Sequence, residues 1–250
     1  MRPNAGLTAN AQTQYIPIMV ISDKRNSNLM VTIGLFASIA WMGTVGSTAA
    51  QTCVPPPGFV DTPAPTVAAV KELVSHTEEI TIDRRLAVVL NSLDKPLEDT
   101  IHKTNSLPGV SGSHMLTQGE FAAPGSRRLN CLSDGSTLVE QVLASESNTN
   151  TFRFRYVVWN YTSEKARPIE YGVGDFYYSD VGGGHTHVTW TYSFQLNRHR
   201  FPGYLGSVGD FIFRVRFLNR EYADLMRGVL DGIKSDAEQL PHDRVSDTRK

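Results

Sequence analysis

The stretch HTHVTWTYSFQL, residues 185–196, decides the fold, because its apolar and polar side chains alternate. Successive side chains of a β-strand point to opposite faces, so this pattern predicts a strand with one apolar face. That face comprises Val188, Trp190, Tyr192 and Phe194. We expect this aromatic face to be buried in a core, and the opposite face, with His185 and His187, to meet solvent.

A long helix is predicted downstream of this strand, because apolar residues recur at steps of three and four from residue 208 to residue 233. The recurring residues are Val208, Phe211, Ile212, Val215, Leu218, Tyr222, Leu225, Val229 and Ile233. Charged residues such as Arg214 and Asp231 occupy most of the other faces. A helix of this kind has to bury its apolar stripe, and the aromatic face of the preceding strand is the nearest partner.

Upstream of residue 185 the chain alternates between strand patterns and turn residues such as Asp134-Gly135. The predicted strands span residues 80–91, 112–120, 126–132, 137–144, 151–160 and 169–179. A short helix that begins at Asp94 is predicted between the first two strands. The other connections are short, which favours antiparallel pairing of neighbouring strands. The sequence therefore predicts an α+β fold, a curved antiparallel sheet of about seven strands wrapped round one long C-terminal helix.

The first fifty residues read as a leader rather than as part of this fold. Lys24 and Arg25 precede an apolar run from Leu29 to Val45, and the small residues Thr48-Ala49-Ala50 follow. This order is typical of a secretory signal peptide, so we expect cleavage after Ala50 and a secreted or periplasmic protein without stable membrane insertion. A signal anchor that stays in the membrane is the alternative.

The remaining chain divides by composition. Residues 51–77 are proline-rich and predict a linker with a short helix over 66–74, residues 78–237 carry the folded domain, and residues 238–250 form a polar tail. In an oxidising compartment Cys53 and Cys131 can pair. The alternative is a buried, unpaired Cys131 and a free Cys53 thiol.

Composition excludes several classes of protein. A hydrophobic share of 40% in 250 residues is too high for intrinsic disorder. A formal net charge of −1 gives no electrostatic reason to expect nucleic acid as a partner. Only two cysteines are present, which excludes a Cys-rich zinc module. No third ligand accompanies His185 and His187 at a recognisable spacing, so we expect no metal site.

Several short motifs follow one another in a familiar order. They are LPGV at 107–110, GSRR at 125–128, VEQV at 139–142, FRFRY at 152–156 and GHTHVTWT at 184–191, followed by the terminal helix. In this order they resemble the START-like superfamily of helix-grip folds, which includes polyketide cyclases, lipid-transfer domains and the birch-pollen-allergen group. The resemblance covers residues 78–237. It implies a seven-stranded sheet that grips the last helix, with an apolar cavity between them and no cofactor, and it does not fix a reaction.

We expect this cavity to hold a small hydrophobic molecule such as a lipid, a sterol or a polyketide-like compound. Strand parity places Gly172 and Gly174 on the outer face of their strand, where missing side chains would permit bending. The predicted ligand-binding residues are Phe154, Tyr156, Val158, Tyr171, Val173, Asp175, Tyr177, Val188, Trp190, Tyr192, Phe211, Val215 and Leu218.

Two functional hypotheses follow from this cavity, and a structural role without any ligand is the third possibility. The leading one is an exported binding protein, which needs only the apolar wall. The second is an enzyme of the cyclase or dehydrase type, in which Asp175 or Tyr177 moves a proton, because a carboxylate on an aromatic face would have a raised pKa. The alternative for Asp175 is a sheet edge or a bulge near Gly174. Glu140 and Arg155 are expected to form a cross-strand ion pair.

Overall fold

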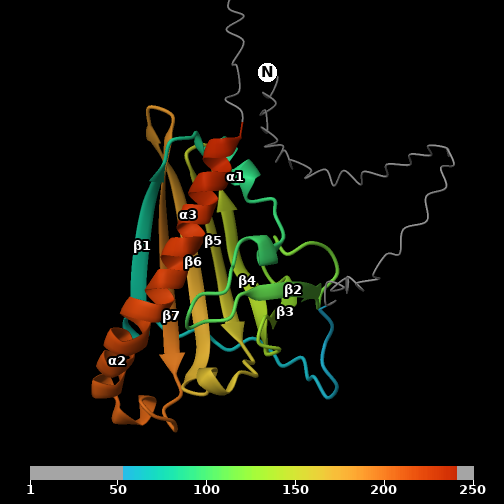
Figure 1. Cartoon of the computed structure of the whole chain (residues 1–250), viewed down its shortest axis with the longest axis vertical. Helices are drawn as coiled ribbons and strands as arrows, with labels where there is room; N and C mark the ends of the chain where they lie inside the picture. The colour runs from blue at the N-terminus through green and yellow to red at the C-terminus, as the bar shows by residue number, and fades with distance from the viewer. Residues whose placement is uncertain (1–52, 241–250) are drawn as a thin grey trace, which may run out of the picture. The chain divides into compact units, whose positions relative to one another are not determined.

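The alternating segments form one seven-stranded antiparallel sheet in the computed structural model, which describes residues 53–240 (Figure 1). The strands are β1 (Val74–Ile82), β2 (Val110–Met115), β3 (Arg127–Leu132), β4 (Thr137–Ser147), β5 (Thr151–Trp159), β6 (Ile169–Gly182) and β7 (His185–Leu196). Their order in the sheet is β1-β7-β6-β5-β4-β3-β2, so β2 to β7 form a meander and β1 returns to pair with β7.

The C-terminal helix runs for 33 residues along one face of the sheet (Figure 1). It consists of α2 (Ser207–Phe213), a π-helical part η5 (Arg214–Tyr222) and α3 (Ala223–Gln239). This arrangement confirms the predicted α+β helix-grip fold. The side chains that it buries against the sheet include Phe213, Leu218, Leu225, Met226, Val229, Leu230 and Ile233.

The helix face differs from the predicted stripe in its first turns. Phe211 and Val215 were predicted to face the sheet, but they are 64% and 39% exposed. The cause is the π-helical part, because its hydrogen bonds join residues five apart and therefore shift the phase of the buried face. Phe213 and Leu218, which are five apart, take the inward positions instead.

Two N-terminal element predictions are also wrong. The expected strand over 80–91 is two elements, β1 and the helix α1 (Leu86–Ser92). Leu86, Val89, Leu90 and Leu93 pack in the core at a helical spacing of three and four residues. The expected helix over 66–74 is reduced to one 3₁₀ turn, η1 (Val70–Glu72), and β1 begins at Val74 rather than at residue 80.

Three further one-turn 3₁₀ segments lie in the connections of the described chain. They are η2 (Leu97–Asp99), η3 (Glu164–Ala166) and η4 (Gly203–Leu205). The helix that was predicted to open at Asp94 corresponds to η2, which begins one residue after Pro96.

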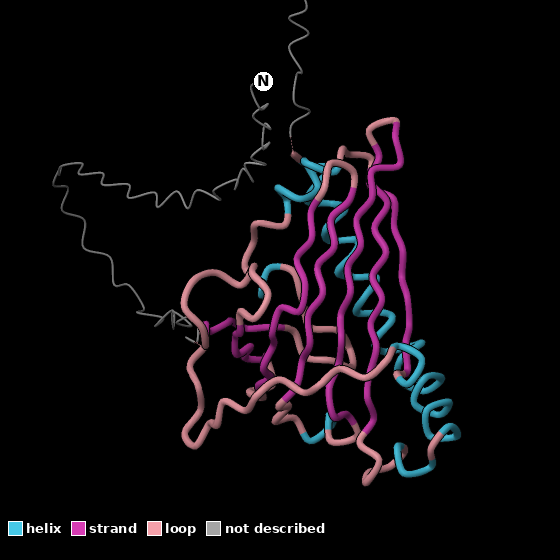
Figure 2. The backbone as a smooth tube through the Cα atoms, turned by 180° about the vertical axis from the view of Figure 1, so that it is seen from behind, coloured by secondary structure: helices cyan, strands magenta, loops and turns pink. Residues whose placement is uncertain are grey.

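The proline-rich segment is packed against the sheet and does not behave as a free linker. Figure 2 shows the chain crossing the face of the sheet opposite the helix. Cys53 forms a disulfide with Cys131. The Trp159 indole N–H donates to Thr62 Oγ1 at 3.0 Å. This segment covers a second apolar core on the outer face, built from Leu129, Val139, Val157, Trp159, Tyr171 and Val173.

Within residues 53–240, no helix is both long and apolar enough to cross a membrane. The predicted signal peptide lies outside the described residues, and export therefore stays a prediction.

Candidate ligand-binding cavity

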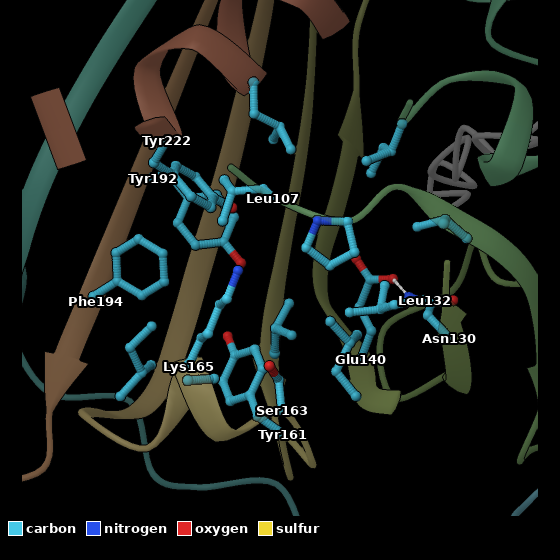
Figure 3. Close-up of a pocket in the computed structure, with 18 of the residues that line it drawn as sticks. Leu107, Asn130, Leu132, Glu140, Tyr161, Ser163, Lys165, Tyr192, Phe194 and Tyr222 are labelled. Carbon is cyan, nitrogen blue, oxygen red and sulfur yellow. Dashed lines mark hydrogen bonds between the residues drawn. The ribbon is translucent and has the colours of Figure 1, made fainter. Parts of the chain in front are cut away.

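A cavity of about 180 Å³ lies between the sheet and the C-terminal helix (Figure 3). Apolar and aromatic side chains make up most of its lining. They are Leu97, Ile101, Leu107, Pro108, Val110, Leu132, Leu138, Tyr156, Val158, Tyr161, Ala166, Ile169, Trp190, Tyr192, Phe194, Phe217, Tyr222 and Leu225. A concave site with this chemistry suits a small apolar molecule.

The β6 strand presents two glycines to the helix side of the sheet, where two tyrosines of the cavity lining pack over them. A Cβ at Gly172 would lie 2.7 Å from Cε1 of the Tyr192 ring, and a Cβ at Gly174 would overlap the Tyr156 ring. Neither position accepts a side chain, because real Cβ atoms do not approach other atoms so closely. Gly172 and Gly174 therefore face the helix, and the tyrosines of the neighbouring strands fill the space above them.

This orientation overturns the predicted face of β6. Tyr171 and Val173 are buried in the outer core, and Tyr177 is 44% exposed. Asp175 also points to the outer face, where the Arg153 side chain donates to both of its oxygens at 2.9 and 2.6 Å. The prediction that these four side chains line the cavity, and that Asp175 or Tyr177 acts in it, is wrong.

Strand alternation alone does not orient β6, because both of its faces carry aromatic residues. Phe176 and Tyr178 face the helix-side core, whereas Tyr171 and Tyr177 lie on the other face. A count of aromatic side chains cannot separate two such faces. The packing of the neighbouring tyrosines over the glycines decides the orientation.

The other predicted ligand-binding residues divide into three groups. Tyr156, Val158, Trp190 and Tyr192 line the cavity. Phe154, Val188 and Leu218 belong to the helix-side core without lining the cavity. Phe211 and Val215 are exposed on the helix, as described above.

The cavity also contains the carboxylate of Glu140, which was predicted to form a cross-strand ion pair with Arg155. Glu140 is 5% exposed and lines the cavity, and its Oε2 accepts bonds from Arg128 Nε at 2.7 Å and from Asn130 Nδ2 at 3.0 Å (Figure 3). The predicted ion pair with Arg155 is wrong, because Arg155 lies 3.8 Å from Asp175 on the outer face. The missed signal is parity, since Glu140 shares a strand face with the apolar residue Leu138.

Ser163, Lys165 and buried tyrosine hydroxyl groups complete the site. Burial raises the pKa of Tyr156, Tyr161, Tyr192 and Tyr222 well above the ordinary range, so these side chains are protonated hydrogen-bond donors at neutral pH. Tyr161 Oη lies beside Tyr192 Oη above Gly172, but it has no partner in hydrogen-bonding geometry.

A second buried donor in this region is the indole of Trp190, whose Nε1 has no hydrogen-bond partner either. The histidines of β7 lie away from the cavity lining. His185 pairs with Asp83 at 3.0 Å, and His187 lies 3.5 Å from Glu79. Among residues 53–240, no three His, Cys, Asp or Glu side chains come together as metal ligands.

Comparison with known proteins finds similarity of fold alone. No protein-family profile matches the chain, and no curated protein sequence matches it either. The crystal structure of Ara h 8.0201 is 12% identical, with a TM-score of 0.46 over 66% of this chain and 98% of that chain. A hypothetical protein from Helicobacter pylori is 12% identical, with a TM-score of 0.47 over 71% of this chain and 99% of that chain.

The di-domain ARO/CYC protein BexL, from the BE-7585A biosynthetic pathway, is 19% identical, with a TM-score of 0.45. The match covers 68% of this chain and 52% of BexL. At these identities and TM-scores nothing about the ligand follows from the matches. The helix-grip architecture rests on the strand order and the C-terminal helix themselves.

Proposed function

We propose that this chain is an exported binding protein that holds a small hydrophobic molecule between its sheet and its C-terminal helix. The observation that carries the proposal is the apolar cavity of about 180 Å³ with aromatic walls from β5, β7 and the helix. Gly172 and Gly174 support it, because they leave room for the rings of Tyr192 and Tyr156, which line the cavity.

The expected affinity follows from the surface that a ligand would bury. Burial contributes about 25 cal/mol per Å² of apolar area, so a ligand that buries about 300 Å² gains roughly 7 kcal/mol. The cost of immobilising the ligand offsets part of this gain. A dissociation constant between about 10 μM and 1 mM is therefore expected for a molecule that fills the cavity.

Two features support export. The leader over residues 24–50 has the order of a signal peptide, and the Cys53–Cys131 disulfide is of the kind that persists in oxidising compartments. N-terminal sequencing of the protein from culture medium or periplasm tests this part, with Gln51 as the expected first residue. Recovery of the uncleaved chain in the membrane fraction would favour the signal anchor.

An enzyme of the cyclase or dehydrase type is the second candidate. The observation that favours it is the placement of Glu140 and four protonated tyrosines around one apolar cavity, since a carboxylate and phenols can transfer protons to a bound substrate. Turnover of a compound extracted from the protein would support this candidate over simple binding.

The test of binding is a titration with N-phenyl-1-naphthylamine, a neutral apolar probe whose fluorescence rises in an apolar site. Mass spectrometry of an organic extract of the folded protein then identifies the natural ligand. We expect saturable probe binding by the wild type and weaker binding by Ile169→Trp, because Ile169 lines the cavity. Glu170→Trp is the matched control, since the neighbouring Glu170 is exposed. Absence of probe binding by the wild type would contradict the proposal.

A further inference from the structure

We propose that α2 and the turn before it dock on the surface of an anionic lipid membrane. The docking surface, called the apolar patch below, consists of exposed apolar side chains from η4, α2 and their flanks. They are Phe201, Tyr204, Leu205, Val208, Phe211 and Val215. The attachment is peripheral, because side chains of a surface helix enter the headgroup region without crossing the bilayer. This inference goes beyond the proposed function, since it concerns the outside of the molecule and not the contents of the cavity.

The first argument is the concentration of exposed apolar side chains in the apolar patch. Twelve large apolar side chains are exposed in the described part of the chain, and six of them lie within residues 201–215. The Phe201 and Tyr204 rings are 6.1 Å apart, and Val208, Phe211 and Val215 recur at helical steps of three and four. Single exposed apolar residues are normal, whereas a contiguous group marks an interaction surface.

The second argument is that α2 is apolar on two opposite sides. Gly209 and Phe213 are buried on the inner side, where the Phe213 ring packs 5.5 Å from the ring of Phe194. Phe211 and Val208 lie on the outer side and are exposed. A helix at a protein surface normally turns polar residues outward, so an outward apolar side indicates a partner.

The apolar patch is held in a fixed shape by contacts between the turn and the helix. The Arg198 guanidinium donates to both carboxylate oxygens of Asp210, at 2.7 and 3.2 Å. The backbone of the turn lies so close to α2 that a Cβ at Gly209 would overlap the carbonyl oxygen of Pro202. A preformed surface loses little conformational entropy when it binds.

The charge around the apolar patch favours an anionic lipid surface as the partner. Residues 198–220 contain five arginines and one acidic residue, Asp210, although the whole chain has a net charge of −1. Arg198 is paired with Asp210. The other four arginines are exposed and form no ion pair within residues 53–240; they are Arg200, Arg214, Arg216 and Arg220. Aromatic side chains flanked by arginines suit the interface of an anionic bilayer.

A second copy of the chain suits this surface less well. In a twofold dimer the apolar patch would face its own counterpart. The unpaired arginines of one copy would then lie opposite those of the other, and like charges across an interface are unfavourable.

The apolar patch lies at the same end of the sheet as one end of the cavity. Ile169, which lines the cavity, is paired with Leu196, and the apolar patch begins five residues later at Phe201. Figure 1 shows α2 and the yellow turn η3 at this end of the sheet. Docking would therefore bring the η3 end of the cavity toward the lipid.

The test is co-sedimentation of the exported protein with vesicles of phosphatidylcholine alone and with vesicles that also contain phosphatidylglycerol. We expect the wild type to bind the anionic vesicles at least about tenfold more tightly, because each arginine near an anionic surface adds to the attraction. Added salt should weaken this binding, since it screens exposed charges.

The apolar contact is tested with the double variant Phe201→Ser, Phe211→Ser. We expect it to bind the anionic vesicles at least about tenfold more weakly, because two aromatic side chains no longer enter the interface. Tyr177→Ser, Val181→Ser is the matched control, since both residues are exposed on β6 outside the apolar patch. Urea midpoints establish that both double variants are folded.

The charge is tested with the double variant Arg214→Gln, Arg216→Gln. We expect it to lose most of the preference for anionic over neutral vesicles, because two of the four unpaired cations are removed. Arg85→Gln, Lys103→Gln is the matched control, since both cations are exposed and lie outside residues 198–220.

The outcomes separate this inference from the proposed function. Equal binding of the wild type to both kinds of vesicle, or unchanged binding of Phe201→Ser, Phe211→Ser, would overturn the inference. A dimer in sedimentation velocity that this variant dissociates would assign the apolar patch to a second copy and would also overturn it. The cavity is tested separately, by titration with N-phenyl-1-naphthylamine without vesicles, because no residue of the apolar patch lines it.

Discussion

Both faces of the sheet carry an apolar core, yet the two cores are covered in different ways. The helix-side face lies against the C-terminal helix, and the contact leaves a cavity beside Tyr156, Trp190 and Tyr192. On the outer face, the chain's own N-terminal segment covers the apolar core, and the Cys53–Cys131 disulfide ties the segment to the sheet. An apolar strand face therefore does not by itself indicate a ligand site. Whether a cavity forms depends on the segment that packs over that face.

The β6 strand shows this difference within neighbouring residues. Gly172 and Gly174 face the cavity and leave space for tyrosine rings. Tyr171 and Val173 face outward, where Tyr171 Oη accepts a hydrogen bond from the Ala68 N–H at 2.9 Å. In this part of β6 the glycines lie on the helix side and the larger residues lie on the outer side.

The largest expected effect is alkaline destabilisation that originates on the helix side. Burial raises the pKa of five tyrosines above the ordinary value of about 10. They are Tyr156, Tyr161, Tyr178, Tyr192 and Tyr222. Above this value the unfolded chain loses protons that the folded chain keeps, so stability is complete below pH about 10 and then falls, by up to about 1.4 kcal/mol per pH unit for each tyrosine.

Urea midpoints between neutral pH and pH 11 measure this loss, and absorbance at alkaline pH counts the tyrosines that ionise in the folded state. Ionisation of these five side chains near pH 10 in the folded protein would contradict their burial.

The next largest effect distinguishes the buried and exposed aromatic residues on the helix side. Phe194 is 2% exposed and contacts the rings of Phe213 and Phe217. We expect Phe194→Ala to lower the free energy of unfolding by about 3–5 kcal/mol, because it leaves a void in the core. Phe211→Ala on the exposed side of the helix is expected to change it by less than about 0.5 kcal/mol. Equal losses for the two variants in urea denaturation would show that Phe211 is buried.

Removal of the disulfide tests whether the N-terminal segment on the outer face influences the cavity on the helix side. We expect the double variant Cys53→Ser, Cys131→Ser to lose about 2–4 kcal/mol of stability, because the bond closes a long loop in the unfolded chain. The affinity for N-phenyl-1-naphthylamine should not change, since neither cysteine lines the cavity. A large loss of probe affinity in a variant that is still folded would mean that the N-terminal segment influences the shape of the cavity.

The smallest effect concerns the ion pair of Asp175 with Arg153. Both side chains are partly exposed, so solvent screens their attraction. We expect Asp175→Asn to cost about 1 kcal/mol or less and to leave probe binding unchanged. If this variant abolished binding, Asp175 would belong to the cavity and the faces of β6 would be reversed.

Much of the fold could be predicted from the sequence because its signals are local. The alternation in residues 185–196 placed Trp190 and Tyr192 correctly on the buried face, and the spacing of Leu218, Leu225 and Val229 located the helix face. Phe211 could not be placed in the same way. Its orientation depends on a π-helical part, whose wider turn changes the phase of a regular stripe.

The site was less accessible to sequence reasoning, because its geometry depends on contacts between strands. The role of Gly174 becomes visible only when the Tyr156 ring is seen above it. Asp175 was predicted to act in the cavity as a carboxylate among aromatic residues, but its partner Arg153 lies on the neighbouring strand β5, on the outer face. The burial of Glu140 could have been predicted, since Glu140 shares one strand face with the apolar residues Leu138 and Val142.

The most direct test of the central claim adds the same side chain to each face of the sheet. Val158→Phe places a ring in the cavity, whereas Thr191→Phe places one on the outer face, which carries no part of the cavity lining. In a fluorescence titration with N-phenyl-1-naphthylamine, we expect Val158→Phe to weaken binding about tenfold or more and Thr191→Phe to leave it unchanged. Weakened binding by Thr191→Phe with unchanged binding by Val158→Phe would place the ligand on the opposite face and contradict the account.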